Sequence, residues 1–278
     1  MIGIDVLEYR FNTVGGFMVI IIVILICFLL GLGLLLYMYR EAFANRVVCH
    51  QLEFADFPES FGKVNLFFIS DVHRRKISEK IIEQVQGKVD IVIIGGDITE
   101  KGVPLDRVKE NILLLKKLGP VIFVWGNNDY EMDVPLLNSL FTSLDVKVLV
   151  NRSLFFESEQ GERFFILGVD DLSTNRADID QALIETDKNS FKILVSHNPD
   201  VARKIQSNHG ISLMLSGHTH GGQIHILGFS LYEKGRLKKE KNRVSLISNG
   251  YGTTGVPLRL GAKAETHLLT IQHCGKAK

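Results

Sequence analysis

Seven side chains of the types that bind metals follow short apolar runs at five separate places in the chain. An Asp and a His two residues apart follow the first run, and two His residues with the same spacing follow the last. Because residues i and i+2 of an extended segment point to the same side, each such pair can reach one ion. One such residue after a strand is usually structural, but five similar strand ends favour a shared metal site. The candidate ligands are Asp71, His73, Asp97, Asn127, His197, His218 and His220.

The ligand types narrow the choice of metal. A mixture of carboxylate, imidazole and amide groups is typical of sites for divalent ions such as Mn²⁺, Fe²⁺, Zn²⁺ or Co²⁺. It is not the ligand set of a thiolate zinc site. Seven ligands exceed what one ion needs, whereas two ions ~3.5–4 Å apart that share one carboxylate would use them all. We therefore predict two divalent ions, with Mn²⁺ as the leading assignment.

These side chains require a fold that brings several strand ends to one edge. Short apolar runs alternate with amphipathic segments in the first part of the soluble region, which is typical of βαβ units. In open α/β sheets, ligands bind beyond the carboxyl ends of the strands, where all the candidates stand. We therefore expect an α/β fold, with strands at 65–70, 90–95, 120–126, 146–150, 163–169, 191–196, 212–215, 243–248 and 267–271 and helices at 76–86, 103–118 and 135–144.

The N-terminal part contains a candidate membrane anchor. Residues 17–39 carry no charge and are nearly all apolar, and at ~1.5 Å per residue they span ~34 Å, enough for the hydrocarbon core. A cleaved signal peptide is the alternative, since Ala42-Phe43-Ala44 resembles a processing site. The run is longer than a signal-peptide core, so we expect an uncleaved single-pass anchor. The predicted segments are 1–16 before the anchor, 17–39 as the anchor, 40–62 as linker and domain entry, and 63–278 as the catalytic domain.

Charge sets the expected side of the membrane and excludes one class of partner. Only Arg10 precedes the apolar run, whereas Arg40 and Arg46 follow it closely, which favours a cytoplasmic domain at the cell membrane. The formal net charge of +1 argues against nucleic acid as a partner, because such partners usually require a strong basic field. The three cysteines have no regular spacing and predict neither a disulfide framework nor a zinc motif. The oligomeric state stays open.

The motifs at the strand ends resemble those of the calcineurin-like metallophosphoesterase superfamily, whose signature runs D-x-H, G-D, G-N-H-D/E, H and G-H-x-H. The strings at 217–224 and 248–259 are similar to a membrane-associated branch that includes UDP-2,3-diacylglucosamine pyrophosphatases and broad-specificity phosphohydrolases. The resemblance implies a four-layer α/β/β/α sandwich. It also implies that Asp97 bridges two metals, one held with Asp71, His73 and His220 and the other with Asn127, His197 and His218.

One position departs from the family motif. Asn128 stands where the family has a histidine that helps the leaving group depart. An amide can donate a hydrogen bond to a phosphoryl oxygen but cannot supply a proton. General acid catalysis typically contributes ~10²–10⁴-fold, so we expect a preference for pyrophosphate, nucleotide or phenolate leaving groups. Asn128 and Asp129 are the predicted catalytic residues, with Asp129 orienting Asn127 or a metal-bound water.

Basic residues are candidates for binding substrate or lipid. Arg74 and Arg75 follow His73 directly and are predicted to contact a substrate phosphate. A denser basic cluster is either an exposed loop or a surface that contacts anionic lipid head groups. It comprises Lys234, Arg236, Lys238, Lys239, Lys241 and Arg243.

The leading interpretation is a membrane-anchored, metal-dependent phosphoesterase. A metal-bridging hydroxide would attack phosphorus directly, and no covalent enzyme intermediate would be needed. The substrate would be a phosphorylated small molecule or a lipid-linked compound, and the enzyme a phosphodiesterase, pyrophosphatase or phosphatase. Two alternatives stay open, a specific lipid-linked nucleotide-sugar pyrophosphatase and a non-catalytic metal-binding scaffold.

Overall fold

Two six-stranded mixed sheets form the frame of the domain. The computed structural model describes residues 2–240 and 242–275, with side chains from residue 16 onward. The first sheet has the order β1 (Val47–Phe54), β12 (Thr266–His273), β2 (Lys63–Ile69), β3 (Ile91–Gly95), β4 (Val121–Val124), β5 (Lys147–Leu149). The second has the order β10 (Arg236–Lys239), β11 (Val244–Ile247), β9 (Leu213–Ser216), β8 (Phe191–Val195), β7 (Arg163–Gly168), β6 (Arg152–Glu157).

Most neighbouring strands in both sheets are parallel. In the first sheet β2, β3, β4 and β5 run parallel, and β12 pairs antiparallel with β2 and parallel with β1. In the second sheet β7, β8, β9 and β11 run parallel, and the edge strands β6 and β10 are antiparallel.

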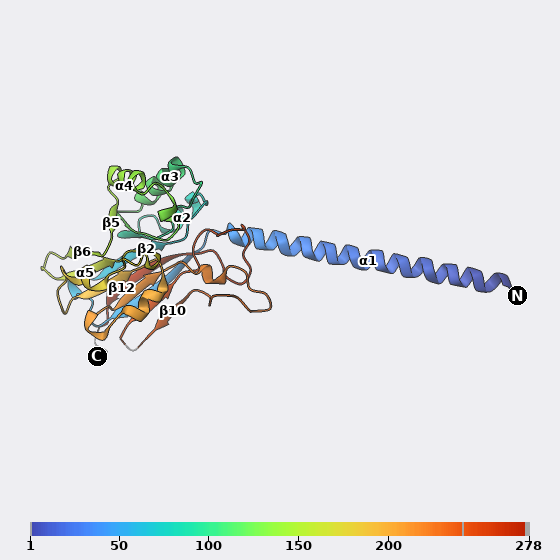
Figure 1. Cartoon of the computed structure of the whole chain (residues 1–278). Coiled ribbons are helices and arrows are strands. Elements are labelled where there is room, and N and C mark those ends of the chain that lie inside the picture. The colour runs from blue at the N-terminus through green and yellow to red at the C-terminus, as the bar shows by residue number, and fades with distance from the viewer. Residues whose placement is uncertain (1, 241, 276–278) are drawn as a thin grey trace.

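The two sheets pack face to face, with helices on their outer faces. Because side chains alternate across a strand, Phe68 of β2 packs in the core between the sheets, whereas its neighbour Phe67 packs beneath the helices. Three helices cover the first sheet, and one short helix covers the second. They are α2 (Glu79–Val85), α3 (Leu105–Lys116), α4 (Val134–Ser143) and α5 (Ile179–Leu183). The predicted four-layer α/β/β/α sandwich is confirmed (Figure 1).

The strands that carry the candidate ligands occupy the middle of each sheet. Strands β2, β3 and β4 are neighbours in the first sheet, and β8 and β9 are neighbours in the second. Since each of these groups is parallel, the carboxyl ends of its strands reach the same edge. The buried apolar runs therefore fix where the polar residues stand.

The N-terminal helix α1 (Ile2–Ala42) projects from the domain as one long rod (Figure 1). Its part Gly16–Ala42 is long and apolar enough to cross a membrane, judged by length and composition. The apolar side chains of residues 17–36 are exposed, whereas Ala42 is buried against the domain. The expected anchor 17–39 lies inside this helix, and residues 2–16 continue the same helix.

Several predicted boundaries need correction. The expected linker 40–62 contains β1, an edge strand on which the alternate residues Leu52 and Phe54 are buried. Its outward residues are polar or half-exposed, so no continuous apolar run marks it. The edge strands β6 and β10 were also not predicted, for the same reason. The predicted helices 76–86 and 103–118 are each shorter in the structure, at Glu79–Val85 and Leu105–Lys116.

Candidate metal centre

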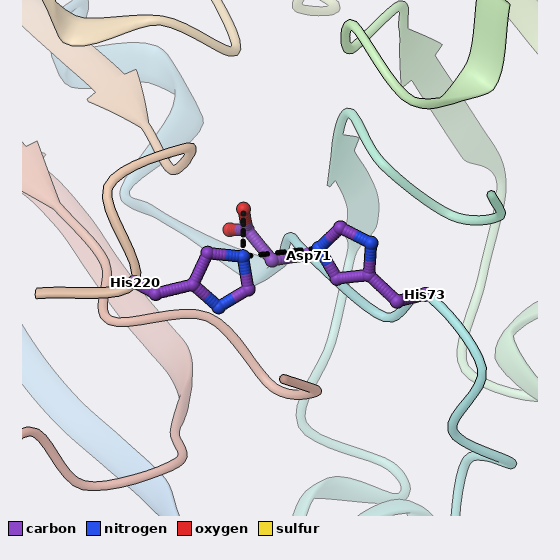
Figure 2. Close-up of side chains that lie close together, drawn as sticks. All are labelled: Asp71, His73 and His220. Atoms are coloured by element: carbon purple, nitrogen blue, oxygen red, sulfur yellow. Dashed lines mark hydrogen bonds and ion pairs between the residues drawn. The ribbon is translucent and has the colours of Figure 1, made fainter. Parts of the chain in front are cut away.

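Five of the seven predicted ligands are buried together at the edges of the two sheets. They form two overlapping groups, Asp71 with His73 and His220, and Asp71 with Asp97 and His197. In the first group His73 Nε2 lies 3.0 Å from His220 Nε2, and His220 Nε2 lies 3.4 Å from Asp71 Oδ1. Figure 2 shows Asp71 and His73, both from the segment after β2, and His220, from a distant part of the chain, converging on one point.

The two remaining predicted ligands, Asn127 and His218, lie beside His197 and Asp97 on the second side of the centre. His197 Nε2 lies 3.1 Å from Asp97 Oδ2, while His73 Nε2 lies 3.8 Å from the same oxygen. Asn127 Oδ1 and His218 Nδ1 are 2.9 Å apart and half-buried. The structure thus brings all seven predicted ligands to one place, with Asp97 between the histidines of the two sides.

The donor set fits divalent cations. Asp71 Oδ2 is buried without a hydrogen-bond partner among the described residues, which is costly unless another group satisfies it. Two nitrogens that each lie ~2.1 Å from one ion would be ~3.0–3.4 Å apart, and the His73 and His220 nitrogens are 3.0 Å apart. Asp71, His73, Asp97 and His220 would hold one ion, and Asp97, Asn127, His197 and His218 the other.

The backbone at the ligands is unusual. Five of them have a left-handed conformation: φ is 55° at Asp71, 52° at His73, 52° at Asp97, 70° at His218 and 50° at His220. Non-glycine residues rarely adopt this conformation, and Asp, Asn and His tolerate it best. Such strain persists only where the surrounding structure enforces it, and it clusters at functional sites.

Glycines make room for the ligands rather than for the ions. A Cβ at Gly96 would lie 2.6 Å from His197 Nδ1, and one at Gly126 would lie 2.2 Å from Asp97 Oδ1. A Cβ at Gly217 would likewise lie 2.3 Å from Asp71 Oδ2. The ligand side chains therefore pack directly against bare backbone.

Asn128 and Asp129 both act on the Asp97 segment. The Asn128 side chain donates to Asp97 Oδ2 at 2.7 Å, and its backbone N–H donates to Asp97 Oδ1 at 2.9 Å. Asp129 is fully buried and accepts from the backbone N–H groups of Asp97, Gly126 and Thr99, at 2.7, 2.9 and 3.1 Å. Among the described residues the Asp129 carboxylate contacts these three N–H groups and not Asn127, so of the two expected partners the metal-bound water stays a prediction. Asp129 positions two ligand loops.

The prediction for Arg75 is corrected by its contacts, whereas a substrate contact of Arg74 stays a prediction. Arg74 is largely exposed, and its guanidinium pairs with Glu100. Arg75 turns away from the metal centre, and its guanidinium donates to the carbonyls of Ala42 and Tyr251 at 3.1 and 2.6 Å. The left-handed turn at His73 reverses the chain, so adjacency in sequence does not place Arg75 beside the ions.

Glu100 is a residue that sequence reasoning missed. Its Oε2 lies 3.0 Å from His73 Nδ1, so it orients the imidazole and leaves Nε2 to face the centre. His197 is oriented in the same way, by the Gly95 carbonyl 2.9 Å from its Nδ1. The only sequence signal for Glu100 is an acidic residue three positions after Asp97.

Electrostatics prepare the histidines for cations. Burial lowers the pKa of His220 to about 4, so this ring is neutral near pH 7. Burial also acts to lower the pKa of His197, but the neighbouring carboxylate of Asp97 outweighs it and raises the pKa to about 10. A cation at His197 Nε2 would therefore displace a proton. Burial raises the pKa of Asp129 to about 8, and the charge of Asp97 adds to the effect.

A pocket of about 360 Å³ opens onto the centre. Asp97, Asn127, Asn128, His218 and His220 are among its lining residues. The lining also includes Gln223, Leu231, Tyr232 and Thr254. A phosphoryl group can therefore reach the predicted ligands from this side.

The basic cluster lies on and around β10. Its charges are partly paired, with Arg236 2.6 Å from Glu233, Lys238 3.0 Å from Glu240 and Arg243 2.6 Å from Glu240. Lys234 and Lys239 are exposed. Lys241 lies outside the described residues.

Comparisons with known proteins agree with this site. The family model described as calcineurin-like phosphoesterase matches residues 64–222, which include all seven predicted ligands. The uncharacterized protein YpbG of Bacillus subtilis is 45% identical over 244 residues, covering 86% of this chain and 91% of that protein. An uncharacterized metallophosphoesterase of Helicobacter pylori J99 is 30% identical over 75% of this chain and 60% of its own length.

Two further relatives concern the membrane and the fold. A transmembrane protein with metallophosphoesterase domain from Danio rerio is 29% identical over 79% of this chain, which spans 56% of that protein. A solved structure of a candidate 5'-nucleotidase from Staphylococcus aureus superposes with a TM-score of 0.51 at 13% identity, over 74% of this chain and 54% of that one. The latter similarity concerns the fold alone.

Proposed function

Since the chain belongs to the calcineurin-like phosphoesterase family and is a metal-dependent phosphoesterase, we propose that it is a membrane-anchored hydrolase that uses two metal ions to cleave phosphoester or pyrophosphate bonds. The observation that carries the two-metal proposal is the position of Asp97 Oδ2, 3.1 Å from His197 Nε2 and 3.8 Å from His73 Nε2. One carboxylate between two histidine groups is the arrangement that a bridging ligand requires.

The chain's own residues hold and orient the reacting groups. Bound cations would supply Lewis-acid stabilisation of the phosphoryl oxygens and would lower the pKa of the attacking water. Glu100 and the Gly95 carbonyl fix the imidazoles of His73 and His197. Asn128 fixes the Asp97 carboxylate, and Asp129 holds the loop that carries Asp97.

Metal binding by the variants tests the bridge. Asp97→Asn is expected to lower the affinity for both ions, whereas His73→Ala is expected to lower mainly one. Titration of the metal-free protein with Mn²⁺, followed by isothermal calorimetry and metal analysis, measures this difference. A wild-type protein that binds a single ion, or equal losses in the two variants, would contradict the two-metal proposal.

The leaving group is the second part of the proposal. Asn128 supplies no proton, so pyrophosphates and esters with phenolate or nucleotide leaving groups are the expected substrates. Asn128→His should therefore raise turnover more on alkyl phosphates than on aryl phosphates. Equal gains on both would count against this interpretation, and binding of metal without turnover of any phosphoester or pyrophosphate would indicate a non-catalytic scaffold.

Helix α1 would be the single-pass anchor, with the domain in the cytoplasm. The proposal rests on the apolar stretch Gly16–Ala42 and on Arg40 and Arg46, which follow the apolar run where only Arg10 precedes it. Cys274 is exposed on the domain and offers a direct probe. A membrane-impermeant maleimide should label it in lysed cells only. Labelling in intact spheroplasts would place the domain outside.

A further inference from the structure

A short loop beside the metal centre exposes an unusual amount of apolar surface. Residues 226–232, here called the apolar loop, include Leu227, Phe229 and Leu231, which are 94%, 82% and 95% exposed. Ile226 and Tyr232 in the same loop are also exposed. Contiguous apolar surface of this kind on a soluble protein usually marks an interaction site with another protein or a membrane.

Backbone hydrogen bonds tie the base of the apolar loop to the segment that contacts α1. His225 N–H donates to the Leu260 carbonyl at 2.8 Å, and Leu260 N–H donates to the Gln223 carbonyl at 2.9 Å. Arg259, which precedes Leu260, donates its N–H to the Met38 carbonyl of α1 at 3.0 Å. The residue that pairs with the base of the apolar loop is therefore adjacent in sequence to the residue that contacts the helix.

The contact with Met38 places Arg259 and the base of the apolar loop near the end of the candidate membrane span. Met38 lies four residues before Ala42, where the candidate span ends, which is ~6 Å along the helix axis. Tyr37 and Tyr39 flank it and are exposed, and tyrosines favour the head-group level of a bilayer. In Figure 1 an orange-brown loop projects from the domain on the side from which α1 leaves.

The end of α1 is fixed to the domain by hydrogen bonds, so the helix and the apolar loop keep one relative position. The Arg75 guanidinium donates to the carbonyls of Ala42, Phe43 and Ala44 at 3.1, 2.7 and 3.0 Å. It also lies 3.7 Å from the centroid of the Tyr251 ring. These bonds satisfy carbonyls at the helix end that lack partners within the helix, and they hold the helix against the domain.

The apolar loop also forms part of the metal pocket. Leu231 and Tyr232 line the same pocket as Asn127, Asn128 and His218. Glu233 follows the loop and pairs with Arg236, and the exposed Lys234 between them suits a surface of anionic head groups.

We propose that the apolar loop inserts into the interfacial layer of the bilayer that α1 enters, so that the metal pocket opens against the lipid surface. If the proposed hydrolase function holds, the substrate is an amphiphile whose phosphate or pyrophosphate reaches the pocket while its acyl chains stay in the bilayer. The occupant of the apolar surface is lipid on this proposal, because hydrogen bonds connect the base of the loop to the segment that contacts Met38 of α1, the candidate membrane helix.

Fluorescence quenching tests the insertion without any measurement of activity. The full chain is reconstituted in single-copy nanodiscs whose phospholipids carry brominated acyl chains, and Phe229→Trp is compared with Leu113→Trp, an exposed position on α3. Trp125, the only native tryptophan, is buried and serves as an internal reference. The added emission of Phe229→Trp should fall at least twofold, and that of Leu113→Trp should not change. Unquenched emission from Phe229→Trp would overturn the proposal. In discs that hold two copies of the chain, a blue shift of that emission without quenching would also overturn it, because this result indicates burial by a second chain.

Activity then tests access from the bilayer. The double variant Leu227→Glu with Phe229→Glu changes loop residues outside the pocket lining, so turnover of a soluble aryl phosphodiester should stay within twofold. Turnover of an amphiphilic pyrophosphate in vesicles should fall at least tenfold, whereas Leu113→Glu should leave both unchanged. Equal losses on both substrates would contradict bilayer access. If the wild type hydrolyses neither substrate, the proposed function fails, and the quenching result still decides the insertion.

Discussion

Replacing Gly126 by alanine should damage the metal centre through one atom. The added Cβ would stand 2.2 Å from Asp97 Oδ1 and 2.5 Å from Asp97 N. Ordinary contact begins at 3.4 Å, so the carboxylate oxygen must move by roughly 1.2 Å (3.4 minus 2.2), while metal–ligand distances tolerate ~0.2 Å. The backbone cannot shift freely to relieve this clash, because Asp129 holds the N–H groups of both segments.

We therefore expect Gly126→Ala to lose tight binding of metal and to lower turnover by ~10²-fold, the loss that a displacement of about 1 Å at a reacting centre can cause. The assays are metal content after gel filtration and hydrolysis of an aryl phosphate at saturating Mn²⁺. Thermal unfolding in the presence of a chelator establishes that the variant still folds.

Gly102→Ala is the matched control. Gly102 has φ +86° and nothing within 4 Å of an added Cβ, so alanine there strains the backbone by about 1–2 kcal/mol without moving a ligand. This control should lose stability and keep its metals. If Gly126→Ala retains two ions per chain and turnover within threefold of wild type, the steric reasoning is refuted.

Three further outcomes are expected. Glu100→Ala should weaken metal affinity by ~10–100-fold, because His73 loses the partner that orients it, and chelator competition measures this against Glu110→Ala as a surface control. Asp129→Asn should leave a buried backbone N–H without an acceptor and lower the free energy of unfolding by about 1–3 kcal/mol, which urea titration would show as an earlier midpoint. Burial lowers the pKa of His267 to about 3. Below pH 6.5 the unfolded chain therefore takes up a proton that the folded chain excludes, and the free energy of unfolding decreases as the pH is lowered. The loss at pH 5 should be about 2 kcal/mol, and metal-free His267→Gln should show a correspondingly smaller difference between pH 7 and pH 5; an unchanged difference would contradict the assignment.

The central strands, and the gathering of the seven candidate side chains at one place, could be predicted because they share one signal. A fully buried strand has a continuous apolar run, and the first polar residue after it stands at the sheet edge. Edge strands such as β1 (Val47–Phe54) and β10 (Arg236–Lys239) are half-exposed, so they lack such a run and were missed.

The supporting residues could not be predicted in the same way. Glu100 and Arg259 act through contacts that depend on how distant loops meet: Glu100 with His73, and Arg259 with the carbonyls of Asn249 and Gly252, both at 2.6 Å. Arg75 shows the opposite error, since adjacency to His73 suggested a substrate contact. A left-handed residue reverses the chain, and neither composition nor periodicity encodes that reversal.

The left-handed backbone at Asp71, His73, Asp97, His218 and His220 also limits how the centre can be redesigned. A site of cysteine or glutamate ligands, built to select a softer metal or to reach farther, would place less tolerant side chains in this conformation. Each exchange would cost about 1 kcal/mol of backbone strain before any coordination chemistry is considered, and five together would approach the net stability of a small domain. An engineer who wants another metal would have to rebuild the turns first and the ligands second.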